Sequence, residues 1–222
     1  MNTLNINNIP RIFSIPRSGS TIMYNIISYI IKSRTPDNVH INIPEYTHNI
    51  FDYDGPVILM YRDFRNVHVS LKKFMQKNDD VYIYRYVTNK INVLNKMNKL
   101  YPSAYKLKYE DWENDIDVAL DLIENVLKIS LSDKEIDTIH YLFSRKTIQN
   151  HTNKLGSYKH KINKSFETPF NTNEDFQYKF FSKNHISKIQ TNWQSDLSKK
   201  WINKYLHEHK KHFINYGYTN NI

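Results

Sequence analysis

A loop near the start of the chain has the residue types that bind oxyanions. Residues 15–21 read Ile-Pro-Arg-Ser-Gly-Ser-Thr and lie between a β-prone run and an apolar helical pattern. This arrangement puts backbone N–H groups and hydroxyls at a helix N-terminus, where phosphate or sulfate oxygens bind without a metal. Arg17 adds a permanent positive charge, and Gly19 lets an anion approach the backbone closely. An ordinary capped turn is the alternative explanation, because Ser and Gly are common at helix starts.

A second group of polar residues follows the most apolar stretch of strand length, residues 57–61. Arg62 comes directly after this stretch, and Ser70 lies eight residues further on, about two helical turns into the next expected helix. Ligands of open α/β sheets bind at the carboxyl ends of the strands. Arg62 is therefore expected at the same sheet edge as the first loop. A helix N-terminus capped by Asp63, with Arg62 as a surface charge, is the alternative.

Hydrophobic periodicity indicates the elements that would hold these loops. The expected strands are 11–15, 39–43, 57–61 and 104–109, and the expected helices are 22–30, 64–75, 80–100 and 116–127. Ser132 to Glu135 resembles a capping box that opens a further helix. Residues 151–178 are expected to form a long loop, and residues 182–212 are expected to be helical. The alternation of strands and helices predicts an α/β fold with a parallel sheet.

The composition fits one domain that spans residues 1–222. With 40% hydrophobic and 14% aromatic residues, the chain can bury a sizeable core, and it has no cysteine for disulfides or thiolate metal sites. Residues 1–8 do not resemble a signal peptide, and the apolar stretch 21–31 is too short to span a membrane, so a cytoplasmic protein is expected. The net charge of +9 suits an anionic partner, although a solvated basic surface is the alternative.

Together the two polar segments resemble the family of sulfotransferases that use 3′-phosphoadenosine 5′-phosphosulfate (PAPS). Residues 16–21 resemble its 5′-phosphosulfate loop, P-K/R-S-G-T/S-T. Residues 62–70 are similar to its 3′-phosphate motif, R-[DN]-P-[RK]-D-x-x-x-S, with Phe64 at the proline position and Asn66 at the aspartate position. Residues 107–111 resemble its [RK]-Y-E-D-L strand end, whose tyrosine contacts the adenine. The resemblance covers about residues 11 to 130.

The resemblance implies a fold and a role for each matching residue. The implied fold has three layers, a central parallel β-sheet flanked by helices, and is the P-loop NTPase-like sulfotransferase fold. Arg17 would touch the 5′-phosphate and the transferring group, Arg62 and Ser70 would hold the 3′-phosphate, and Tyr109 would lie near the adenine. Ile22 stands where cytosolic members often carry an adenine-stacking tryptophan. The residues expected to surround the 5′-phosphosulfate are Ser18, Gly19, Ser20 and Thr21.

Two further assignments from the resemblance have several candidates. Residues 131–222 would form a helical and loop C-terminal part, from which Lys154 or Lys159 would reach the 3′-phosphate. The catalytic base of many members is the histidine of a K-T-H sequence, and residues 46–48 supply its T-H. His48 is therefore the first choice of base, and His40 and Glu45 are the competitors.

The implied reaction is an in-line transfer of a sulfuryl group from PAPS to a hydroxyl, with no metal, which releases adenosine 3′,5′-bisphosphate. The acceptor would be a small molecule, a glycan or a protein tyrosine. One alternative is a P-loop-type nucleoside or nucleotide kinase, but the G-x-x-x-x-G-K-[ST] pattern is absent from the sequence. The other is a non-enzymatic basic module, but no nucleic-acid-binding motif is present, so nucleic acid is not expected as a partner.

Overall fold

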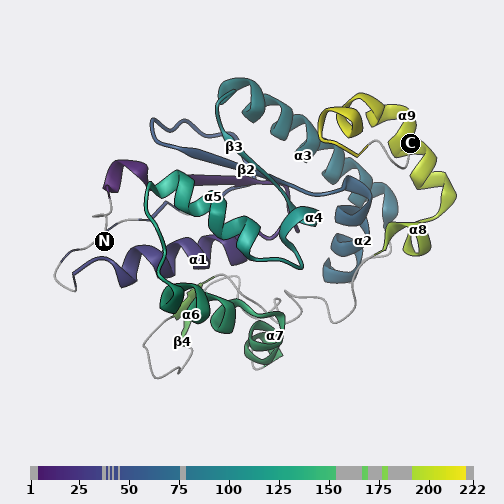
Figure 1. Ribbon diagram of the computed structural model, residues 1–222. Helices are drawn as coiled ribbons and strands as arrows, with labels where there is room; N and C mark the ends of the chain where they lie inside the picture. Colours follow the sequence, from purple (N-terminus) through teal and green to yellow (C-terminus); the bar gives the residue numbers. More distant parts are fainter. Residues whose placement is uncertain are drawn as a thin grey trace.

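Three short runs of the sequence pair as parallel strands, and helices lie on both sides of them (Figure 1). The computed structural model describes residues 5–36, 39, 41, 43–44, 46–75, 79–153, 167–169, 177–179 and 192–218. The strands are β1 (Arg11–Ser14), β2 (Val57–Tyr61) and β3 (Tyr105–Lys108), in the order β1-β2-β3. In their register Ile12 pairs with Ile58, which pairs with Tyr105. The predicted α/β class with a parallel sheet is confirmed.

The sheet separates two hydrophobic cores, because successive side chains of a strand point to opposite faces. Ile12 and Ile58 face the core formed with α1 (Ser20–Ser33), α5 (Asp117–Leu127) and α6 (Asp133–Phe143). Phe13 and Leu59 face the core formed with α2 (Phe64–Met75), α3 (Asp80–Leu100) and α9 (Lys199–Asn215). The central strand β2 is thus buried on both faces, as its continuous apolar sequence predicts.

The boundaries of the main helices follow from local chemistry. The capping box predicted at Ser132 and Glu135 opens α6, and the carboxylate of Glu135 also accepts a hydrogen bond from Arg34 Nε at 2.7 Å. That ion pair ties the start of α6 to the end of α1 and lowers the pKa of Glu135 to about 2. Asp79 caps α3 through the backbone N–H of Tyr82. No helix in the described ranges is long and apolar enough to cross a membrane.

The strand expected at 39–43 is wrong. Val39, Ile41 and Ile43 lie in no strand, and pairing with β1 occurs instead at Thr47, beyond Pro44. The N–H of Ser14 donates to the carbonyl of Thr47, and the N–H of Thr47 donates to the carbonyl of Ile12, both at 3.0 Å. Pro44 has no N–H and therefore offers no donor to a ladder.

The C-terminal part differs from its expected form. Helix α7 (Arg145–Asn153) and the antiparallel strands β4 (Glu167–Pro169) and β5 (Gln177–Lys179) interrupt the region expected as one loop. In its described part, the region 182–212 is helical as expected, with the short α8 (Trp193–Asp196) followed by α9 and extended backbone at Leu197 and Ser198 between them. Strands of three residues are too short to show a period of two in the sequence. Two other short elements, η1 (Ile6–Asn8) and α4 (Tyr109–Trp112), complete the described fold.

Candidate functional site

The loop between β1 and α1 has a backbone that exposes N–H groups to a ligand. Arg17 and Gly19 have left-handed φ angles of 67° and 84°. Gly19 is the N-cap of α1 and carries no side-chain cap, so the first N–H groups of the helix point out of the helix end. A Cβ atom on Gly19 would lie 2.4 Å from Cζ2 of Trp112, so the loop is held against the residues that follow β3. This geometry suits an anion at the helix N-terminus.

Arg17 and Arg62, which are 45 residues apart in sequence, meet at this loop. The Nη1 of Arg62 donates to the carbonyl of Arg17 at 3.1 Å. The Nε of Arg17 donates to Oγ of Ser70 in α2 at 3.0 Å. The guanidinium of Arg62 lies 4.3 Å above the ring of Tyr109, and that of Arg17 lies 4.6 Å from the ring of Phe74. The structure therefore brings together four residues that the sequence singled out, from the ends of three strands and from α2.

The electrostatics of this cluster favour an anionic ligand. Burial, together with the charge of Arg62, lowers the pKa of Arg17 to about 10. Arg17 is still protonated at neutral pH, so two positive charges lie side by side in a partly desolvated place. A ligand with more than one negative charge would offset their repulsion. Burial also raises the pKa of Tyr109, which keeps its hydroxyl protonated as a hydrogen-bond donor.

The hydroxyls of the loop have different surroundings. Ser18 is fully buried, and its Oγ donates to the carbonyl of Ile15 at 2.6 Å, which stabilises the turn itself. Thr21 Oγ1 donates to the hydroxyl of Tyr46 at 3.0 Å. The side chain of Ser20 is also buried, at the first position of α1. Thr21 is therefore the hydroxyl that links the loop to the segment carrying the candidate base.

His48 lies beside the last residue of β1. Its Nδ1 is 2.7 Å from the carbonyl oxygen of Ser14 and 3.0 Å from the Oγ of the same residue. A carbonyl oxygen only accepts, so Nδ1 carries the hydrogen and Nε2 keeps its lone pair in the neutral ring. Burial lowers the pKa of His48; the Ser14 hydrogen bond opposes this effect, and the charge of Lys90 adds to it. At neutral pH the ring is uncharged and able to accept a proton.

A chain of contacts joins His48 to the loop between β1 and α1, residues 15–19, which we call the anion loop. The rings of His48 and Tyr46 are 5.6 Å apart, and Tyr46 reaches Thr21 through the hydrogen bond described above. The candidate base and the candidate anion site thus occupy the same edge of the sheet. The other predicted residues, His40, Glu45, Lys154 and Lys159, lie outside the described part of the chain, and their roles stay predictions.

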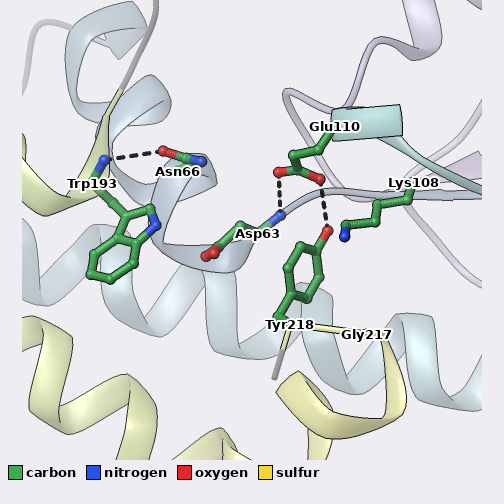
Figure 2. Close-up of a pocket in the computed structure, with 7 residues that line it drawn as sticks. All are labelled: Asp63, Asn66, Lys108, Glu110, Trp193, Gly217 and Tyr218. Carbon is green, nitrogen blue, oxygen red and sulfur yellow. Dashed lines mark hydrogen bonds between the residues drawn. The ribbon is translucent and has the colours of Figure 1, made fainter. Parts of the chain in front are cut away.

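The residues that directly follow Arg62 and Tyr109 tie the ends of β2 and β3 together. Figure 2 shows the carboxylate of Glu110 accepting from the N–H of Asp63 at 3.0 Å and from the hydroxyl of Tyr218 at 2.9 Å. Asp63 in turn binds the buried Arg65 at 2.6 Å. These contacts border a cavity of about 270 Å³ that contains none of the predicted site residues. The residues that line it are Asp63, Asn66, Lys108, Glu110, Trp193, Gly217 and Tyr218.

Several residues of the site were not predicted from the sequence. Phe74 lies four residues after Ser70 and so on the same helix face, which is a signal that the spacing contains. Lys90 lies in helical register with Val87 and Leu94 on the apolar face of α3, and a charged residue on such a face is a signal that the sequence contains. Trp112, by contrast, gives no sign in the sequence that it touches Gly19.

Known proteins resemble this chain in structure but not detectably in sequence. No family model matches the sequence, and no curated protein matches it significantly. The crystal structure of mouse sulfotransferase SULT7A1 complexed with PAP does match, with a TM-score of 0.60 over 96% of this chain and 89% of that chain, at 11% sequence identity. The chain has the sulfotransferase fold. The predicted P-loop-like sulfotransferase architecture is therefore confirmed.

Proposed function

We propose that this protein is a PAPS-dependent sulfotransferase that transfers a sulfuryl group to an acceptor hydroxyl. The observation that carries the proposal is the meeting of Arg17, Arg62 and Ser70 at the strand ends of a sulfotransferase fold. The similar solved structure is complexed with PAP, which supports the choice of nucleotide. In this proposal one domain spans residues 1–222, the protein acts in the cytoplasm, and the acceptor is a small molecule, a glycan or a protein tyrosine.

The described residues fit such a donor. Arg17 and the open N-terminus of α1 would bind the 5′-phosphosulfate, because a guanidinium and backbone N–H groups complement its oxygens. Arg62, between β2 and α2, and Ser70, in the second turn of α2, would hold the 3′-phosphate, since both meet Arg17. Tyr109 would border the adenine from the end of β3. The loop residues proposed to surround the phosphosulfate are Ser18, Gly19, Ser20 and Thr21.

The proposed reaction breaks the bond between sulfur and the 5′-phosphate oxygen while the acceptor oxygen forms a new bond to sulfur. His48 Nε2 accepts the proton of the acceptor hydroxyl, and the Ser14 carbonyl orients the ring through Nδ1. Arg17 and the N–H groups of α1 stabilise the negative charge that develops on the departing phosphate, an effect typically of about 3 kcal/mol for one fixed donor. Together these groups align donor and acceptor, which lowers the entropic part of the barrier.

Calorimetry with adenosine 3′,5′-bisphosphate in the presence of a chelator tests the nucleotide assignment. We expect micromolar binding to the unmodified protein and a loss of about 2 kcal/mol, or about thirtyfold in affinity, for R62A, because a charge-assisted contact is removed. The matched control is R85A, since Arg85 is an exposed arginine on α3. Equal affinity of R62A and the unmodified protein would contradict the proposed 3′-phosphate site.

A screen of acceptors with sulfur-labelled PAPS then tests the transfer itself. Turnover that requires Mg²⁺ and ATP instead would favour the kinase alternative. Steeply salt-dependent binding of RNA or DNA, without competition by the bisphosphate, would favour the nucleic-acid-binding module. Either result would replace the sulfotransferase proposal.

A further inference from the structure

Lys90 occupies an unusual position for a lysine. It lies on the buried face of α3, and only 9% of the residue is exposed. Its Nζ donates to the backbone carbonyl of His48 at 3.0 Å and to Oδ1 of Asn49 at 3.1 Å. In the described part of the chain, no carboxylate forms an ion pair with Lys90. Among the described residues, the ammonium group is therefore compensated by neutral oxygens of the segment that carries the candidate base and by the ring of Tyr86, whose centroid is 5.5 Å away.

This arrangement costs stability. A buried charge that the described residues provide with no counterion is unfavourable, and burial lowers the pKa of Lys90. An apolar side chain would continue the buried row formed by Val87 and Leu94 without that penalty. A lysine at this position thus calls for a role other than holding α3 to the sheet.

We propose that Lys90 is a positioning residue for His48, holding the backbone that carries the imidazole and placing a fixed positive charge beside the ring. The proposal rests on the proposed function, because it assigns His48 the role of base. It adds a residue outside the three motifs, from a helix that carries none of them.

Two hydrogen bonds, one to the ring and one to the backbone, hold His48. The carbonyl of Ser14, at the end of β1, binds Nδ1 of the ring, and Lys90 binds the backbone oxygen of the same residue. Because the ring and the backbone of His48 are both fixed, β1 and α3, which are rigid elements, set the direction of Nε2. Among the described residues, Ser14 from β1 and Tyr46 from its own segment contact the ring, and Lys90 from α3 contacts the backbone of His48.

The charge of Lys90 has a second effect on the same ring. A positive charge disfavours the imidazolium form, and it acts in the same direction as burial on the pKa of His48. Removing the charge should raise that pKa, so the acidic limb of the pH–rate profile should move to higher pH. A lysine that only stabilised the fold would leave this limb unchanged.

The test compares K90M, which removes the charge and both hydrogen bonds, with K90R, which keeps a charged donor. The matched control is K96M, because Lys96 is an exposed lysine of the same helix. Proton NMR titration of the histidine ring hydrogens, with H48Q to assign the His48 signal, measures its pKa without any turnover. We expect K90M to raise the His48 pKa, K90R to keep it near the unmodified value, and K96M to have no effect.

Activity adds a second readout. We expect K90M to lower kcat by about tenfold or more with the KM for PAPS changed less than about twofold, because the nucleotide site is untouched. An unchanged His48 titration in K90M overturns the proposal, as does an equal shift in K96M. If K90M does not fold, K90Q, which is neutral but still donates hydrogen bonds, is judged by the same pKa criterion. Since the titration requires no acceptor, it decides the role of Lys90 even if no sulfuryl transfer is found.

Discussion

Gly19 is subject to two separate constraints at one position. Its φ of 84° lies in the left-handed region, where a side chain costs about 1–2 kcal/mol. Its missing Cβ also leaves room for the ring of Trp112, which would otherwise be 2.4 Å away. The left-handed φ is required by the turn itself, and the missing Cβ determines how closely the anion loop approaches Trp112 after β3.

The variants G19A and G217A separate these two constraints. Gly217 also has a left-handed φ, of 74°, but a Cβ there would meet nothing within 4 Å. We expect G217A to lose about 1 kcal/mol of unfolding free energy and to bind adenosine 3′,5′-bisphosphate normally. G19A should lose more stability and at least about tenfold in affinity, because Trp112 and the loop must separate. Denaturant unfolding and calorimetry measure both effects, and equal behaviour of the two variants would contradict the argument.

At the residue scale, the sequence predicted the residues whose signal is local. Arg17 and Arg62 each follow a strand, and the rule that strand ends share one edge of a parallel sheet was enough to expect them together. Trp112 and the orientation of His48 depend on tertiary contacts with Gly19 and Ser14 that no spacing encodes. The catalytic and binding roles of these residues stay predictions until they are tested.

Among the elements, the junction of β2 with β3 determines how Arg62 and Tyr109 are presented. Glu110 bridges this junction, since its carboxylate receives hydrogen bonds from the N–H of Asp63 and from the hydroxyl of Tyr218. Burial raises the pKa of Glu110, although these hydrogen bonds oppose the effect. The bridge holds the two residues that follow β2 and β3 at a fixed separation, and it does so from outside the nucleotide site.

Removing the bridge should therefore weaken nucleotide binding indirectly. We expect E110A to lower the unfolding free energy by about 2 kcal/mol, because two buried donors lose their acceptor, and to lower bisphosphate affinity several-fold. D111A is the matched control, since Asp111 is the exposed neighbouring acid in α4. Denaturant unfolding and calorimetry provide the measurements. Full affinity in a destabilised E110A would show that the bridge serves the fold alone.

Elements with a long periodic pattern were predicted well, and short ones were not. Helices α2 and α3 begin and end where their apolar spacing indicates, because each buries a stripe of several turns. The run 39–43 alternates like a strand, but its described residues Val39, Ile41 and Ile43 lie in none, and the pairing with β1 occurs at Thr47. The strands β4 and β5 have three residues each, which is too short for an alternating hydrophobic pattern to be recognised in the sequence.

For the whole molecule, α9 closes one face of the sheet and buries histidines beneath it. His68 is fully buried between the hydroxyl of Tyr205 at 3.0 Å and the carboxylate of Asp80 at 3.1 Å. His209 lies at a kink in α9, with non-helical φ and ψ, and contacts Thr88 in α3 at 3.1 Å. Burial lowers the pKa of both rings. The packing of α9 on α2 and α3 therefore depends on neutral imidazoles.

Stability should consequently fall in mild acid. The pKa of His209 is lower in the folded state than in the unfolded state, so the unfolded chain binds the proton first. The contribution to stability is complete above about pH 6.5 and is lost as the pH falls through the folded pKa. Each such group contributes a slope of at most about 1.4 kcal/mol per pH unit. H209Q should flatten this dependence, whereas H207Q, at an exposed position of the same helix, should not. Urea unfolding across this pH range measures the slopes, and equal slopes for both variants would contradict the role of His209.

The bond between Tyr218 and Glu110 spans 108 residues of sequence and bears on how the protein is made. While a ribosome is still adding α9, the finished β2 and β3 have no cover over their ends, and the buried Arg65 lacks its stacking partners Trp193 and Phe213. Domains tend to fold as units during synthesis, so we expect this domain to fold only after α9 has been made. A chain that terminates before α9 would then contain all three motifs but lack Tyr218, which binds the bridge between the ends of β2 and β3.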